Sequence, residues 1–181
     1  MISFNDLTYH LDLDKKIYVG YSGGPDSTAL LYLLHSNGIS NIEAIHINHN
    51  LSSNSAEWED HCKQTSKKLG IPCHVESVEI KIDGDGLESA ARKARYKIFT
   101  KYLQEGDQIL LGHHSNDVAE TFLLRLFRGT GIDGLESLNI KRGVGDGYLV
   151  RPLINLSKEE IMMYLRENNI SYIKDESNDG Q

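Results

Sequence analysis

The chain has few of the residues that staple small secreted domains or cross membranes. It holds two cysteines, Cys62 and Cys73, among 181 residues, and no Cys-x-x-Cys pair. Two distant cysteines favour free thiols over a disulfide framework. No apolar run in the sequence approaches the roughly 20 residues of a membrane-spanning helix. Acidic residues interrupt the N-terminal stretch, which does not resemble a signal peptide. We therefore expect a cytoplasmic protein without membrane contact.

Basic residues are in the minority. The chain has 19 Lys and Arg against 26 Asp and Glu, for a formal net charge of −7. This balance excludes non-specific nucleic-acid binding through the whole surface, because Lys and Arg make the phosphate contacts. The net charge does not exclude a local basic patch. The length fits one ordinary globular domain that needs no metal staple.

Short apolar runs alternate with helical patterns along the chain. This alternation predicts an α/β fold with a doubly wound, mainly parallel sheet and helices on both faces. Glycine-rich residues 129–147 are expected to form a loop region with at most one short helix. The expected strands are Ile17–Tyr21, Ile42–Ile47, Cys73–Val78, Gln108–Gly112 and Tyr148–Val150, and the expected helices are Asp26–His35, Ala56–Leu69, Leu87–Tyr102, Ser115–Arg128 and Ser157–Asn169.

The most informative segment is SGGPDS, from Ser22 to Ser27, between an apolar strand and an apolar helix. Its glycines let the backbone turn sharply and approach a ligand, and its proline suits the first turn of a helix. Free N–H groups and the positive end of the helix dipole predict an anion site there. The hydroxyls of Ser22, Ser27 and Thr28 can add donors.

The same segment lacks the Gly-Lys-Ser/Thr ending of a Walker A loop, which excludes an ordinary P-loop NTPase. Asp26 is unusual in this place, because a carboxylate beside phosphates is repulsive unless Mg²⁺ bridges the two. Alternatively, the glycines form only a turn and Asp26 caps the helix. The order of strand, hydroxyls and helix favours the phosphate site.

Ser-Gly-Gly-x-Asp-Ser after a first strand resembles the PP-loop of the ATP pyrophosphatases. The resemblance implies the Rossmann-type fold of that superfamily, also called adenine nucleotide alpha hydrolase-like, and cleavage of ATP between the α and β phosphates. GMP synthetases, NAD synthetases, tRNA thiolases and lysidine synthetases share the loop, which does not choose among them.

Four further segments resemble the tRNA(Ile)-lysidine synthetases in order and spacing, and together they cover nearly the whole chain. The most specific is HHSNDVAETFLLRLFRGTGIDG, from His113 to Gly134. The others are HINHNL from His46, ESAARKARY from Glu88, and Arg151-Pro152-Leu153 leading to DESN from Asp175.

Two of these segments carry candidate ligand contacts. His46 and His49 have a spacing compatible with a metal, but the absence of a nearby cysteine or carboxylate disfavours zinc. The resemblance implies that the backbone after the second strand touches adenine. Arg92 and Arg95 are predicted to project together from an exposed helix face, where they are either solvated or clamp phosphates. The resemblance favours the clamp, with Arg92 as first choice.

Asp117 stands at the start of a helix, where a carboxylate also serves as a cap. It follows the carboxyl end of a parallel strand, where ligands bind in open α/β sheets. The resemblance implies that Asp117 assists catalysis near the transferring phosphate, with His113 beside it. Asn116 replaces a frequent aspartate of the family, which leaves more weight on Asp117. Arg125 and Arg128 either meet RNA phosphate or are ordinary surface charges.

The resemblance implies adenylation of the C2 oxygen of the wobble cytidine in tRNA(Ile) with a CAU anticodon, followed by attack of L-lysine. A homodimer is left open. The alternatives are a tRNA 2-thiolation enzyme of the same superfamily and a non-catalytic nucleotide-binding module. The expected catalytic residues are Asp26, Arg92, Arg95, His113 and Asp117, the expected nucleotide-binding residues are Ser22, Gly23, Gly24, Pro25, Asp26, Ser27, Ile47 and His49, and the expected Mg²⁺ ligands are Asp26 and Asp117.

The family continues beyond the DESN segment into further domains. We therefore expect residues 1–181 to form a single N-terminal PP-loop ATP-binding domain, truncated before them. On that expectation, this piece binds ATP without efficient tRNA modification.

Overall fold

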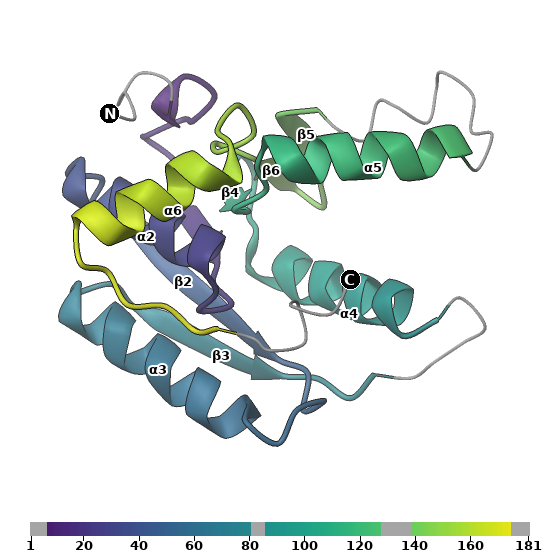
Figure 1. Ribbon diagram of the computed structural model, residues 1–181, viewed down its shortest axis with the longest axis horizontal. Helices are drawn as coiled ribbons and strands as arrows, with labels where there is room; N and C mark the ends of the chain where they lie inside the picture. Colours follow the sequence, from purple (N-terminus) through teal and green to yellow (C-terminus); the bar gives the residue numbers. More distant parts are fainter. Residues whose placement is uncertain (1–6, 81–85, 128–138, 175–181) are drawn as a thin grey trace.

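The computed structural model describes residues 7–80, 86–127 and 139–174. The described elements are, in chain order, β1 Ile17–Gly20, α2 Pro25–Ser36, β2 Ile42–Asn48, α3 Ser55–Lys68, β3 Cys73–Ser77, α4 Leu87–Tyr102, β4 Gln108–Leu110, α5 Ser115–Phe127, β5 Lys141–Val144, β6 Gly147–Val150 and α6 Lys158–Glu167 (Figure 1). Within the described residues, the predicted helices and strands are confirmed, and their ends differ from the predicted ones by at most two residues.

The strands form one sheet in the order β3-β2-β1-β4-β6-β5. β1 pairs in parallel with both β2 and β4, and β6 pairs in parallel with β4. The chain winds outward from β1 through β2 to β3 and then crosses to β4 on the other side of β1. Such a reversal opens a crevice at the carboxyl ends of the strands, where α/β proteins bind ligands. The predicted fold class is confirmed.

Two apolar clusters cover the two faces of the sheet. One contains Leu30 of α2, Cys62 of α3 and Ile161 of α6, and the other contains Ile98 and Phe99 of α4. Neighbouring strand residues supply both, since successive side chains of a strand point to opposite faces. The predicted helices on both faces are therefore present.

The prediction of a loop over residues 129–147 is wrong for its last part. β5 pairs antiparallel with β6 across a turn at Gly145, whose φ is +56°. Lys141 and Arg142 lie on this edge strand. Its sequence lacks the alternation of apolar and polar residues from which a strand is predicted. Pairing with the buried β6 makes the segment a strand, and its charges suit an exposed edge. Residues 128–138, including Arg128, lie outside the described residues, as does the DESN segment.

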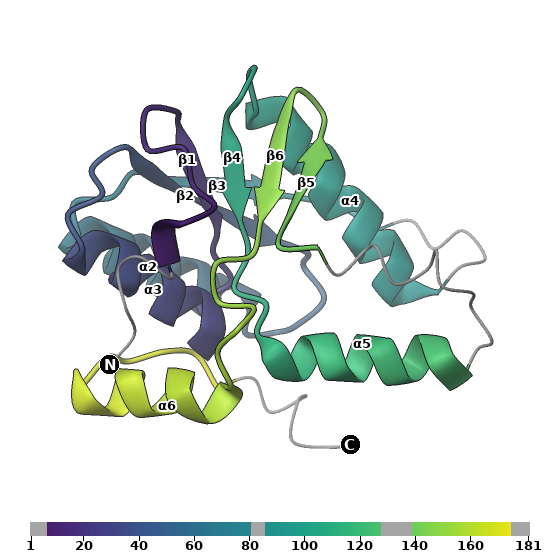
Figure 2. The ribbon, with the colours of Figure 1, turned by 90° about the horizontal axis from the view of Figure 1, so that it is seen from above.

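α5 differs from the other helices in its packing. In Figure 2 it runs outward from the carboxyl ends of β4 and β6. None of its described residues is buried, although its apolar positions repeat at helical spacing. Leu126 is 60% exposed and Phe127 is 83% exposed. The pattern therefore predicted the helix correctly, but it does not mark a side packed against the described core.

Candidate active site

The loop between β1 and α2 forms the base of the site. Gly23 has a φ of +84°, a left-handed conformation that suits glycine. A Cβ at this position would lie 2.3 Å from Cδ1 of Ile173. Gly24 is the N-cap of α2 and Pro25 occupies its first turn, and no described side chain caps the helix at Gly24. The first N–H groups of α2 are therefore available to an anion.

The loop hydroxyls divide into two roles. The main cavity of the site lies between this loop, the end of β2, α4 and the start of α5. The Ser22 and Ser27 hydroxyls line it and lie 3.0 Å apart, and Ser27 Oγ donates a hydrogen bond to the Gly24 carbonyl. Thr28 is fully buried, and its hydroxyl donates to the Gly23 carbonyl at 3.1 Å. Thr28 therefore supports the loop from behind, whereas the two serines face the ligand side.

The end of β2 supplies the neighbouring wall. Nδ1 of the buried His46 lies 2.9 Å from the Tyr21 carbonyl oxygen, which ties β2 to the loop. Ile47 and His49 line the cavity itself. Burial lowers the pKa of His49, and the nearby Arg95 guanidinium lowers it further. A neutral His49 suits contact with an uncharged ring better than a role as a phosphate counter-ion.

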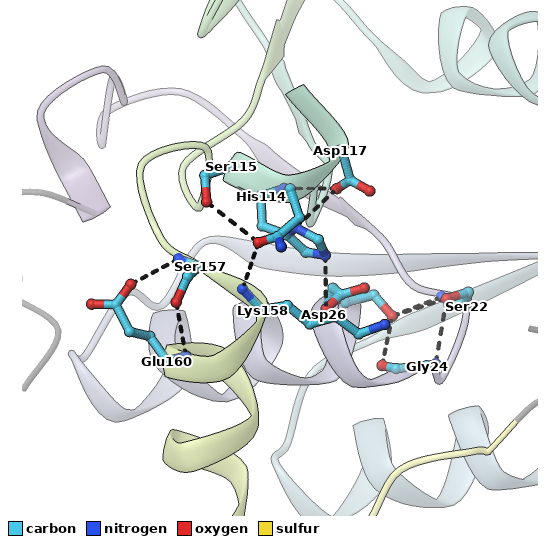
Figure 3. Close-up of polar contacts among 11 residues, drawn as sticks. Ser22, Gly24, Asp26, His114, Ser115, Asp117, Ser157, Lys158 and Glu160 are labelled. Carbon is cyan, nitrogen blue, oxygen red and sulfur yellow. Dashed lines mark hydrogen bonds and ion pairs between the residues drawn. The ribbon is translucent and has the colours of Figure 1, made fainter. Parts of the chain in front are cut away.

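Asp26 of α2 and Asp117 of α5 face the same cavity from different elements, with His114 between them (Figure 3). His114 Nε2 lies 3.7 Å from Asp26 Oδ1, and His114 Nδ1 lies 3.6 Å from Asp117 Oδ2. These distances exceed those of hydrogen bonds. Burial raises the pKa of Asp26, the Asp117 charge raises it further, and His114 and Lys158 oppose the rise. The site thus concentrates negative charge that invites a cation.

His114 is a site residue that the sequence reasoning missed. It is 5% exposed, and its ring separates the two carboxylates. The His-His pair was the available signal, but the sequence does not tell which imidazole turns toward α2. In the structure it is His114 that turns toward Asp26 of α2. The helix packs closely against the segment after β4 at this point, since a Cβ on Gly112 would lie 2.9 Å from the Asp26 carbonyl carbon.

Asp117 also serves its own helix. Its Oδ2 accepts a hydrogen bond of 2.8 Å from the His114 backbone N–H at the start of α5. The capping interpretation is confirmed, and the ligand interpretation stays a prediction that the place of the carboxylate at the cavity wall permits. Asn116 has a separate task, since its Oδ1 accepts from the backbone N–H of Lys158 at the first turn of α6.

The two arginines of α4 do not share one environment, contrary to the prediction that both project from an exposed face. Arg95 is half-buried and lines the main cavity. Arg92 is exposed, lies 5.4 Å from the Tyr96 ring centroid and borders a small side cavity with His113 and Asp117. The two arginines therefore border different cavities, although they lie one helical turn apart on α4.

The main cavity has a volume of about 280 Å³. Of the other predicted residues, Gly23 shapes the turn and Pro25 borders an adjoining cavity of about 720 Å³. The predicted residues that line the main cavity are Ser22, Gly24, Asp26, Ser27, Ile47, His49, Arg95, His113 and Asp117.

The carboxylates fit a magnesium ion that is shared with phosphate. Asp26 Oδ1 is buried and has no hydrogen-bond partner among the described residues. The described residues contain no group of three side chains able to hold a metal alone. Mg²⁺ is usually bound by one or two carboxylates together with substrate phosphates. Asp26 supplies such a carboxylate, and Asp117 lines the same cavity on the other side of His114.

The PP-loop domain family matches residues 3–181, nearly the whole chain. The chain belongs to this family. Curated relatives of this chain include a tRNA(Ile)-lysidine synthase of Pseudomonas syringae, which is 43% identical over 91% of the chain. Another is the tRNA(Ile)-lysidine synthase of Coxiella burnetii, which is 40% identical over 93% of the chain. The chain spans 38% of the length of each relative.

Solved structures support the fold of this PP-loop chain. The tRNA thiolase NcsA of Methanococcus maripaludis is similar with a TM-score of 0.75 and 19% identity, over 94% of this chain and 63% of that one. An NAD synthetase of Campylobacter jejuni gives 0.57 and 15%, over 91% and 72%. No helix in the described part of the chain is long and apolar enough to span a membrane.

Proposed function

We propose that this chain is the nucleotide-binding part of a tRNA(Ile)-lysidine synthase. The observation that carries the proposal is its identity of 40–43% with curated proteins of that name over nine-tenths of its length. The site supports it, since a helix N-terminus, two carboxylates and an arginine meet in one cavity. A homodimer and a cytoplasmic location stay predictions.

The proposed reaction has two steps on ATP, tRNA(Ile) with a CAU anticodon and L-lysine. The C2 oxygen of the wobble cytidine attacks the α-phosphorus of ATP, and the bond to pyrophosphate breaks. The uncharged ε-amine of lysine then attacks C2, the C2–O bond breaks, AMP leaves with the oxygen, and the amine loses a proton. The first step needs alignment and charge neutralisation rather than a protein nucleophile.

The described residues divide these tasks. The first turn of α2 and the hydroxyls of Ser22 and Ser27 hold phosphate oxygens. Arg95 is better placed than Arg92 to neutralise them, because it lines the main cavity. Asp26 and Asp117 would hold Mg²⁺, which would supply screening of the phosphate charge. Ile47 and His49 lie where the base of the nucleotide is expected.

Thiolation by the same scaffold is less well supported. Among the described residues, the two cysteines are free, and Cys62 is fully buried. Burial raises the pKa of both the Cys62 and the Cys73 thiol. The thiolate is the reactive form, so neither cysteine suits sulfur transfer.

The test is mass spectrometry of tRNA(Ile) incubated with the protein that contains this chain, ATP and isotope-labelled lysine. We expect one cytidine to gain the labelled lysine with loss of water, together with AMP and pyrophosphate. Gain of sulfur would indicate thiolation. ATP–pyrophosphate exchange dependent on the tRNA separates an enzyme from a binding module. An unchanged cytidine, with ATP bound, would refute lysidine synthesis.

A further inference from the structure

We propose that His113 is held as the neutral imidazole with its proton on Nε2, and that it donates this proton in a hydrogen bond to an anion in the main cavity. Arg151 is the positioning residue that fixes the tautomer. His113 is thereby assigned as an electrophilic donor and not as a general base. The identity of the anion as an ATP phosphate rests on the proposed function.

The contact between the two side chains sets the tautomer. Arg151 Nε lies 3.2 Å from His113 Nδ1 in a hydrogen bond. A guanidinium N–H only donates, and arginine keeps its charge at any physiological pH. His113 Nδ1 must therefore accept and carries no proton.

Arg151 is fixed well enough to impose this choice. The residue follows β6 and is 5% exposed. Its guanidinium donates a second hydrogen bond of 2.7 Å to the Asn139 carbonyl, and its backbone N–H donates to the Ile140 carbonyl. These contacts connect the His113 ring at the end of β4 to the chain on both sides of the β5–β6 hairpin.

The surroundings also disfavour a cationic ring. Burial lowers the pKa of His113 to about 4, and the charges of Arg151, Arg92 and Arg95 lower it while Asp117 opposes them. A neutral imidazole whose Nδ1 is an acceptor carries its proton on Nε2.

The proton lies on the side of the ring away from Arg151, because the two ring nitrogens point in different directions. His113 lines the main cavity together with Ser22 and Asp26, whereas Arg151 borders only the small side cavity. A phosphate oxygen in the main cavity can therefore accept from Nε2. The nitrogen that would have to take up a proton in base catalysis is instead occupied by Arg151.

The direct test is the ¹⁵N spectrum of the histidine rings in the unliganded wild-type chain at pH 7. The eight histidines can be labelled together, and His113→Gln identifies the ring of interest. We expect a protonated Nε2 and an unprotonated Nδ1. A cationic ring or an Nδ1–H tautomer would overturn the proposal. This measurement needs neither tRNA nor lysine, so it stands apart from failure of lysidine synthesis.

Three variants extend the test. His113→Gln keeps an N–H donor near Nε2, whereas His113→Leu has none. The loss of a hydrogen bond to a charged group predicts ATP binding about 10-fold weaker in the Leu variant than in the Gln variant. Equal affinities would overturn the donor role. Arg151→Met, which has no N–H donor in its side chain, should admit a measurable Nδ1–H fraction, and an unchanged tautomer in that variant would remove Arg151 from the proposal.

Discussion

Helices α2 and α5 both begin where a parallel strand ends, and each brings one carboxylate to the cavity, but they are held in different ways. Leu30, Leu31 and Leu34 of α2 are fully buried in the core. α5 has no buried residue among those described, and polar contacts at its first turn attach it to the segment before α6. Core packing therefore positions Asp26, whereas hydrogen bonds position Asp117.

The largest effect on activity should come from removing the charge of either carboxylate. On the proposed function, we expect Asp26→Asn and Asp117→Asn, each made in the protein that contains this chain, to reduce lysidine formation roughly 100-fold or more, since metal-assisted charge neutralisation contributes several kcal/mol. Their thermal stabilities should move in opposite directions at pH 7. Asp117→Asn weakens the acceptor for the His114 N–H and lowers Tm.

Asp26→Asn should instead raise Tm at pH 7. The pKa of Asp26 in the folded chain lies above its ordinary value, mainly through burial. The stability that its neutral form provides is present at low pH and is lost as the pH rises through the folded-state pKa. The gain in Tm should therefore shrink on acidification. A fall in Tm at pH 7 would contradict this account of the carboxylate.

The buried Leu30 of α2 and the exposed Leu126 of α5 should differ next in what they contribute to stability. Leu30→Ala is expected to lower the free energy of unfolding by about 2–5 kcal/mol, as for other buried leucines. Leu126→Ala, at a position 60% exposed, should change it by no more than about 0.5 kcal/mol. Urea denaturation of both variants measures the difference. Similar losses would show that the outer side of α5 is covered in solution.

The loop before α2 should respond to a single methyl group. Gly23→Ala places a side chain at a φ of +84° and directs its Cβ against Ile173. The left-handed conformation alone costs about 1–2 kcal/mol. Gly38→Ala is the matched control, because its φ is +75° and nothing lies within 4 Å of the added Cβ. A larger loss in Gly23→Ala, seen by thermal denaturation, reports the contacts of the added Cβ with Ile173 and Cys62.

The smallest effect is expected at the junction of α5 with α6. Asn116→Ala removes the acceptor for the Lys158 N–H and should cost about 1 kcal/mol. Ser157→Ala removes the side-chain cap of the same helix, also at about 1 kcal/mol. Amide exchange separates the two, since only Asn116→Ala should increase exchange in the first turn of α5. Equal exchange would mean that Asn116 does not anchor α5.

The comparison also shows what the sequence could predict. The strand–loop–helix unit around Ser22 to Ser27 was predicted because local chemistry dictates it, with glycine turns, a proline in the first turn and a buried apolar helix. The mainly parallel sheet and the helices on both of its faces were predicted from periodicity, whereas the strand order was not. The start of α6 is equally local, since Ser157 and Glu160 stand three residues apart and form both hydrogen bonds of a capping box.

What sequence reasoning missed depends on contacts between distant segments. β5 forms because it pairs with β6. The sequence from Lys141 to Val144 contains no pattern that predicts a strand. The place of His114 between two carboxylates depends on α2 packing against the end of β4. The link from Arg151 to His113 joins residues 38 positions apart. Such roles follow from how the ends of neighbouring strands converge.

A titration of the ¹⁵N-labelled chain with ATP and Mg²⁺ tests the central claim most directly, namely that the cavity between α2 and α5 binds the nucleotide. We predict saturation at one ATP per chain, with coincident shifts of the backbone amides of Ser22, Gly24 and Ser27 and of the His113 ring. Saturating ATP that leaves these signals unmoved, or that shifts only residues of β3 and the outer face of α4, would contradict it.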